Sequence, residues 1–208
     1  MSRENLIVRY RAIERINHWI VAFCFVLLAL SGLALFYPAF FWLTGVFGTP
    51  QLARIIHPFV GVVMFTGFSV MFLRYWKHNL VNREDIKWMM AVGTVLKGGE
   101  VGDTGKYNGG QKGMFWLMAG CLLVMLVTGF IMWRPYFAPM FPIPLIRLAL
   151  LFHAWSALIL IAGIIIHVYA AIWVKGTIRA MVEGVVTTSW ARVHHPKWLR
   201  EMQAKPRK

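Results

Sequence analysis

The sequence contains few acidic residues and little cysteine. Only 8 of its 208 residues are Asp or Glu, against 22 Lys and Arg, and it has two cysteines. Cys24 and Cys121 form no CxxC pair, so the sequence offers no ligand set for zinc or an iron–sulfur cluster and no disulfide framework. It also lacks a small-residue cleavage site after its first apolar run, so we expect no cleaved signal peptide.

What the sequence has instead is long apolar segments. Hydrophobic residues make up 59% of the chain, and the mean hydropathy is +0.60. Four windows are apolar enough to cross about 30 Å of hydrocarbon. They cover roughly residues 19–36, 58–76, 113–133 and 148–174. The sequence therefore predicts an all-α membrane protein, a single domain over residues 1–208, with four transmembrane helices in a bundle.

The positive charges predict how these helices are oriented. The segment before the first span carries four Lys or Arg, the connection over residues 74–112 carries seven, and the tail from Lys175 carries eight. The other two connections carry three, so the division is nineteen against three. Cytoplasmic segments are rich in Lys and Arg. We therefore expect both termini and the middle connection in the cytoplasm, and contact with lipid rather than nucleic acid.

The long middle connection and the tail predict further structure on the cytoplasmic side. Asn82 has the character of a helix N-cap, followed by acidic residues in the first turn. We expect an interfacial helix over residues 86–96 and then a glycine-rich turn over residues 98–110. The tail, which contains His194 and His195, is interpreted as a basic and aromatic surface segment.

Four histidines lie inside or at the mouths of the spans, and the predicted topology places them at two depths. His57 and His153 share the outer level, and His18 and His167 share the inner level. A single membrane histidine can simply form a hydrogen bond between helices. Four at paired depths favour a functional site, because ionisable groups within a membrane span are costly. His78, beside basic residues at the end of the second span, is interpreted as an exposed boundary residue.

The spacing of the histidines in the fourth span favours two stacked haems. Fourteen residues separate His153 from His167, which is about 21 Å of helix rise and returns to within roughly 40° of the starting direction. Both rings therefore lie on one helix face. Two imidazoles per iron fill both axial positions and favour electron transfer over chemistry at the iron. Metal binding without haem is disfavoured, as is an ion-coupled transporter, because no carboxylate lies deep in a span.

The chain resembles the cytochrome b (gamma) subunits of membrane-bound respiratory formate dehydrogenases over nearly its whole length. The resemblance rests on several runs of sequence: Arg15-Ile-Asn-His18-Trp19, Phe47-Gly-Thr-Pro-Gln51, Arg54-Ile-Ile-His57-Pro58, Gly105-Lys-Tyr-Asn-Gly-Gly-Gln111, Thr128-Gly-Phe-Ile-Met-Trp-Arg-Pro-Tyr-Phe137, Trp173-Val-Lys-Gly176 and His194-His-Pro-Lys-Trp198. The resemblance implies a location in the inner membrane of a bacterium. The bundle is then expected to hold two haems b, ligated by the two histidine pairs given above.

The resemblance also implies the reaction and its partners. Electrons would pass from an alpha subunit with a molybdenum or tungsten pterin, through an iron–sulfur beta subunit, to this chain and then to a quinone, menaquinone or ubiquinone. Asn108 and Gly110 match the family's quinone-site positions. From the residues alone, Asn108 equally suits a turn. The chain would be the electron-transfer, quinone-reducing subunit, and formate oxidation would not occur on it. The alternative is the cytochrome b subunit of a membrane-bound hydrogenase or a related quinone-linked oxidoreductase.

Overall fold

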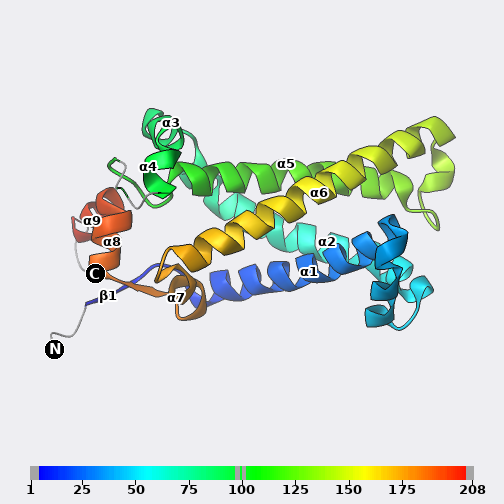
Figure 1. Cartoon of the computed structure of the whole chain (residues 1–208), viewed down its shortest axis with the longest axis horizontal. Coiled ribbons are helices and arrows are strands. Elements are labelled where there is room, and N and C mark those ends of the chain that lie inside the picture. The colour runs from blue at the N-terminus through cyan, green and yellow to red at the C-terminus, as the bar shows by residue number, and fades with distance from the viewer. Residues whose placement is uncertain (1–4, 97–98, 100–101, 205–208) are drawn as a thin grey trace. The chain divides into compact units, whose positions relative to one another are not determined.

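The computed structural model describes residues 5–96, 99 and 102–204, which contain four long helices (Figure 1). They are α1 (Ala12–Phe36), α2 (Pro50–Tyr75), α5 (Gly109–Met132) and α6 (Ile143–Trp173). All four are long and apolar enough to cross a membrane. The shortest, α5, has 24 residues and rises about 36 Å, more than the hydrocarbon core requires. The predicted all-α membrane fold is confirmed.

The long helices end within one residue of the predicted spans but begin four to eight residues earlier. Hydropathy marks only the part of a helix that suits lipid, whereas a helix starts where its first N–H groups find partners. At the start of α1, the backbone N–H of Arg11 donates to Glu14 Oε2 over 2.7 Å. At the start of α5, the Asn108 side chain accepts from the backbone N–H of Gln111 over 2.9 Å.

Short elements connect the long helices or follow them. They are β1 (Leu6–Val8), η1 (Pro38–Phe47), η2 (Trp76–Asn79), α3 (Arg83–Met90), α4 (Val92–Leu96), η3 (Ala138–Met140), α7 (Thr177–Val182), β2 (Val185–Thr187), α8 (Thr188–His194) and α9 (Pro196–Gln203).

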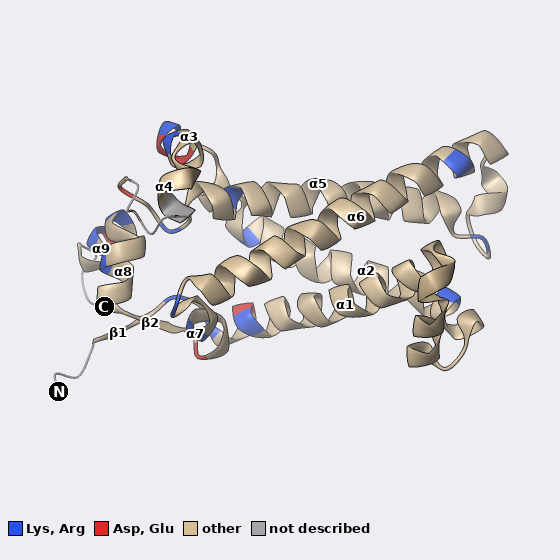
Figure 2. Cartoon of the chain, viewed as in Figure 1, with Lys and Arg blue, Asp and Glu red and all other residues tan. Residues whose placement is uncertain are grey.

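The chain divides into two compact units, which we name by their composition. The polar unit consists of Met1–Arg15, Arg74–Trp116 and His167–Lys208, and the apolar unit consists of Ile16–Leu73 and Leu117–Ile166. Figure 2 shows charged residues on the short elements of the polar unit, whereas the long helices are almost free of them. That the whole chain acts as one domain remains a prediction.

The apolar unit is a bundle to which all four long helices contribute. Its core includes Cys24 of α1, Phe68 of α2, Leu122 of α5 and Leu160 of α6. Large apolar side chains also cover its outside; Phe23, for example, is 66% exposed. A helix that is apolar all round is typical of a membrane span. The bundle is therefore built to lie in lipid.

The polar unit is held together by pairing between the two ends of the chain. β1 pairs antiparallel with β2, with Ile7 opposite Val186. Val186 belongs to a small core with Trp198 and Leu199 of α9. Distant parts of the sequence therefore form one folded body outside the long apolar stretches.

His195 lies at the centre of the polar unit, although the sequence suggested a surface position. Its side chain is only 1% exposed. The Arg9 guanidinium can only donate, so its contact of 3.1 Å with Nε2 makes that nitrogen an acceptor. Nδ1–H then donates to the carbonyl of Gly105 over 2.7 Å. Burial, with the positive charge of Arg9, lowers the pKa of His195 to about 3.

The middle connection begins with the predicted N-cap. Asn82 and Asp85 form a reciprocal capping box at the start of α3. The predicted interfacial helix is divided in two, since α3 ends at Met90 and α4 starts at Val92. The predicted glycine-rich turn is shorter than expected because Gly109 already belongs to α5. Its first residue, Gly98, lies outside the described residues.

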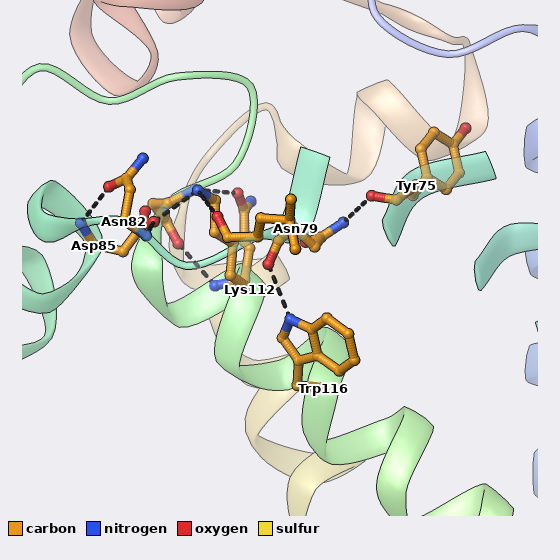
Figure 3. A network of polar contacts seen from close by, with 9 residues as sticks. Tyr75, Asn79, Asn82, Asp85, Lys112 and Trp116 are labelled. Carbon is orange, nitrogen blue, oxygen red and sulfur yellow. Dashed lines mark hydrogen bonds and ion pairs between the residues drawn. The ribbon is translucent and has the colours of Figure 1, made fainter. Parts of the chain in front are cut away.

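A buried ion pair joins this connection to α5 (Figure 3). Lys112 and Asp85 are each 6% exposed, and their charged atoms lie 2.7 Å apart. Lys112 Nζ also donates to the carbonyl of Leu80 over 3.0 Å, and Asp85 Oδ2 accepts from the backbone of Asn82 over 2.8 Å. Trp116 Nε1 donates to the carbonyl of Asn79 over 2.9 Å. These bonds fix the start of α5 against the connection.

We expect removal of one partner of this pair to be more harmful than removal of both charges. Lys112→Ala should lower the free energy of unfolding by about 3–5 kcal/mol, because it leaves Asp85 buried and unpaired. The double variant Lys112→Met, Asp85→Asn should recover more than half of that loss. Chemical denaturation of the purified protein measures both changes. A single variant as stable as the unmodified chain contradicts this prediction.

We expect acid to lower the stability of the polar unit, because it protonates His195. Because the pKa in the folded state lies below the ordinary value of 6.5, the unfolded state binds more protons between those two pH values. The stability from a neutral His195 is therefore complete above about pH 6.5 and falls as the pH approaches 3. Hydrogen exchange over residues 185–199, corrected for intrinsic rates, should show earlier opening in acid. His195→Asn should flatten this pH dependence, whereas His78→Asn, at an exposed histidine of the middle connection, should leave it intact.

Candidate metal centre

The structure brings His57 and His153 together inside the apolar unit. His57 lies in the third turn of α2 and His153 in the third turn of α6. Their ring centres are 6.3 Å apart and their ring planes are inclined by 56°. Both side chains are half-buried. The two residues expected to share the outer level are therefore neighbours in space.

A serine on α1 determines which nitrogen of His57 carries the proton. Ser31 Oγ lies 2.7 Å from His57 Nδ1 and 2.8 Å from the backbone carbonyl of Leu27. A carbonyl can only accept, so the serine hydroxyl donates to Leu27 and accepts from the ring. His57 is then protonated at Nδ1, which leaves the lone pair of Nε2 available to a metal ion.

Thr128 of α5 makes the same arrangement for His153. Its Oγ1 lies 2.9 Å from His153 Nδ1 and 2.7 Å from the carbonyl of Val124. By the same argument, His153 carries its proton on Nδ1 and has an unprotonated Nε2. Metal-bound histidines commonly donate their second N–H in this way, which fixes the tautomer and the orientation of the ring.

A glycine follows each of these hydroxyl residues and faces the same ring. A Cβ added to Gly32 would lie 3.5 Å from His57 Cε1, and one added to Gly129 would lie 3.5 Å from His153 Cε1. The missing side chains let each ring lie close to the neighbouring helix. Sequence reasoning identified both histidines but missed Ser31 and Thr128. The sequence did contain a signal, a hydroxyl residue followed by glycine. Ser31 lies 26 residues before His57, and Thr128 lies 25 residues before His153.

These features fit an iron held between two imidazoles. Metal–imidazole bonds are about 2 Å long, so one metal ion bound to both rings requires ring centres about 6 Å apart. The observed separation of 6.3 Å meets that requirement. Both rings present an unprotonated Nε2, the form that binds a metal. Two imidazole ligands and no other side chain are what a haem iron takes from a protein in bis-histidine ligation.

The other two predicted ligands lie in different units, so their pairing remains a prediction. His18, in the second turn of α1, belongs to the apolar unit, and His167, in the second-last turn of α6, belongs to the polar unit. Beside His18, the Asn17 amide donates to the carbonyl of Gly67 over 2.8 Å and so joins α1 to α2. Both histidine side chains are half-buried. His78 is exposed, as its interpretation as a boundary residue requires.

Asn108 and Gly110, the expected quinone-site residues, have structural tasks at the start of α5. Asn108 and Gln111 form reciprocal side-chain to backbone bonds of 2.9 and 3.1 Å, so Asn108 is the N-cap of the helix. A Cβ on Gly110 would lie 2.9 Å from the ring of Trp88. Glycine is therefore required there for close packing. The cap uses Oδ1 of Asn108 and leaves its amide N–H groups for another acceptor.

Asn108 also lies on the wall of a polar cavity in the polar unit. The cavity has a volume of about 250 Å³, and its wall includes Lys77, Asp85, Lys112 and Lys197. Burial raises the pKa of the Tyr107 hydroxyl, also on this wall, well above its ordinary value. The loop before α5 thus places neutral donors beside a wall that carries both cations and carboxylates.

Comparisons with known proteins agree with the geometry. Residues 9–184 match the model of the family described as prokaryotic cytochrome b561. The chain is 59% identical over 203 residues to the formate dehydrogenase cytochrome b556(fdo) subunit of Escherichia coli strain K12, covering 98% of this chain and 96% of that protein. It is 50% identical over 205 residues to the nitrate-inducible cytochrome b556(Fdn) subunit of the same strain, covering 98% and 94%.

A third relative comes from Haemophilus influenzae. Its formate dehydrogenase cytochrome b556 subunit is 50% identical over 203 residues, which cover 97% of this chain and 85% of that protein. The family implies a haem b cofactor and an electron-transfer role in the membrane. A family match over most of the chain, with relatives this similar over nearly all of it, shows that the chain belongs to the prokaryotic cytochrome b561 family, among the cytochrome b subunits of formate dehydrogenases.

Proposed function

We propose that this chain carries electrons through two haems b from periplasmic partner subunits to a quinone reduced at the cytoplasmic side of the membrane. The partners are an iron–sulfur beta subunit and an alpha subunit with a molybdenum or tungsten pterin. The observation that carries the proposal is the His57–His153 pair, with its ring separation of 6.3 Å and both Nδ1 atoms bound to hydroxyls. The names of the relatives favour formate dehydrogenase over a hydrogenase.

The four histidines have distinct places in this proposal. His57 and His153 hold the outer haem, and His18 and His167 hold the inner one. When bound, haem supplies one-electron redox chemistry, which no side chain of the site provides. The four imidazoles would hold the two irons and would leave no site on them for oxygen.

The charge distribution supports the direction of transfer. Nineteen of the 22 Lys and Arg lie in the segment before the first span, the middle connection and the tail, which supports a cytoplasmic location for these segments. Electron transfer from the periplasmic side inward then works against a potential that is negative inside. Moving one full charge costs about 2.3 kcal/mol per 100 mV. The difference between the formate and quinone couples must supply at least that cost, and the work done against the potential is what is conserved as proton motive force.

The quinone is proposed to bind at the loop before α5, where Asn108 and Gly110 lie. A quinone carbonyl accepts hydrogen bonds, and the amide N–H of Asn108 is a donor that the helix cap does not use. Tyr107, next in sequence, stays protonated at neutral pH. The polar cavity on this loop gives water a place beside the site from which protons can be taken up.

The ligand assignment is tested by removing single histidines. We expect His57→Ala and His153→Ala each to lose one haem, the same one, while the second haem keeps its spectrum. Pyridine haemochrome analysis of the purified complex measures the haem content, and redox titration identifies which haem remains. His78→Ala is the matched control at an exposed histidine and should retain both haems. Two haems in both the His57 and the His153 variant would contradict the assignment.

The quinone role of Asn108 can be separated from its capping role. Asn108→Asp keeps an N-cap oxygen but removes the amide donor. We expect it to retain both haems and to slow reoxidation of the reduced haems by a quinone analogue about tenfold, the effect of one lost hydrogen bond to the substrate. Stopped-flow spectroscopy measures this rate. An unaltered rate in Asn108→Asp would exclude the proposed contact.

A further inference from the structure

Each histidine of the proposed outer haem rests on a hydroxyl–glycine step of the preceding long helix. Ser31 and Gly32 of α1 support His57, and Thr128 and Gly129 of α5 support His153. The two arrangements agree in sequence spacing, in hydrogen-bond pattern and in the close approach of the glycine. The same ligand support therefore occurs twice in the apolar unit.

Both hydroxyls are shielded from solvent. Ser31 is 1% exposed and Thr128 is 7% exposed. Water cannot easily replace either bond if the hydroxyl is removed. His57 would then lose its hydroxyl acceptor, and His153 would keep only its backbone contact with Met125. In a low dielectric the bond is also stronger than it would be in water. These two contacts therefore act on the rings more strongly than a surface hydrogen bond would.

We infer that Ser31 and Thr128 are positioning residues that hold His57 and His153 with Nε2 free for iron and set the reduction potential of the outer haem. The inference rests on the proposed ligand pair. Each hydroxyl accepts the Nδ1–H of its ring and donates to a backbone carbonyl. These two consecutive hydrogen bonds polarise one another. An imidazole that donates its second N–H is a more basic ligand.

The expected sign follows from that basicity. A more basic ligand stabilises the ferric state relative to the ferrous state and so lowers the potential, one of the levers by which a protein tunes haem. Loss of either hydroxyl should therefore raise the potential of the outer haem. The hydrogen bonds of Ser31 and Thr128 act on the two ligands of one iron. The double variant should therefore shift the potential further than either single variant. The inner haem should not respond.

The test uses the purified complex containing Ser31→Ala, Thr128→Val or both changes. Optical redox titration should show two haems, with the outer one more reduced than in the unmodified complex at the same potential. The ratio of reduced to oxidised haem should rise about threefold or more for one variant. Low-spin electron paramagnetic resonance should show changed g values for that haem alone, because the rings are freer to rotate.

Hydroxyl-retaining and matched variants complete the design. Thr128→Ser and Ser31→Thr keep the acceptor and should titrate close to the unmodified complex. Thr66 and Ser69 of α2 donate to carbonyls of their own helix in the same way, over 2.9 and 2.8 Å, and neither hydroxyl forms a hydrogen bond with a histidine in the described part of the chain. Thr66→Val and Ser69→Ala should therefore leave both potentials unchanged.

The outcomes separate this inference from the ligand assignment. If His57→Ala and His153→Ala each lose the outer haem, but Ser31→Ala and Thr128→Val leave its potential and g values unchanged, only the positioning role is overturned. If Thr128→Ser shifts the potential as far as Thr128→Val, the hydroxyl is not the operative group and the inference is again wrong. If the histidine variants keep both haems, the ligand assignment itself fails.

Discussion

The His57–His153 site depends on one constraint: an imidazole among apolar helices needs an acceptor for its N–H. Water is scarce there, and an unsatisfied polar group is costly. For His57 and His153, a hydroxyl of the neighbouring helix satisfies Nδ1. That bond also leaves the other nitrogen in the form that binds iron. Satisfying the buried ring and preparing a metal ligand are therefore achieved by the same contact.

The polar unit obeys the same constraint with different partners. His195 has both ring nitrogens bonded to the protein, to Arg9 and to the carbonyl of Gly105. It therefore has no nitrogen left for a metal, although it is more deeply buried than His57. The partners of a histidine, rather than its depth, separate a structural residue from a candidate ligand.

This explains how far the sequence could predict the site. The four spans followed from hydropathy. The proximity of His57 and His153 followed from charge and depth, because the depth of a residue depends on its position along a helix. The burial of His195 and the bonds of Ser31 and Thr128 depend on contacts between distant segments, which no local pattern records. The starts of the helices depend on local caps, which hydropathy does not register. The role of Asn108 was left open between a turn and a ligand contact. The structure assigns its oxygen to the cap of α5, and its amide group remains a candidate for quinone.

The hydroxyls that support the two rings do not disrupt the backbone hydrogen bonds of their own helices. A backbone carbonyl has two lone pairs, so the carbonyls of Leu27 and Val124 can accept a side-chain hydroxyl without giving up their helical bonds. The hydroxyls and glycines come from α1 and α5, and the imidazoles come from α2 and α6. All four helices must therefore pack before the ring pair has its geometry. It follows that the bundle itself orients the ligands, so a haem entering the site meets rings whose freedom has already been reduced by folding.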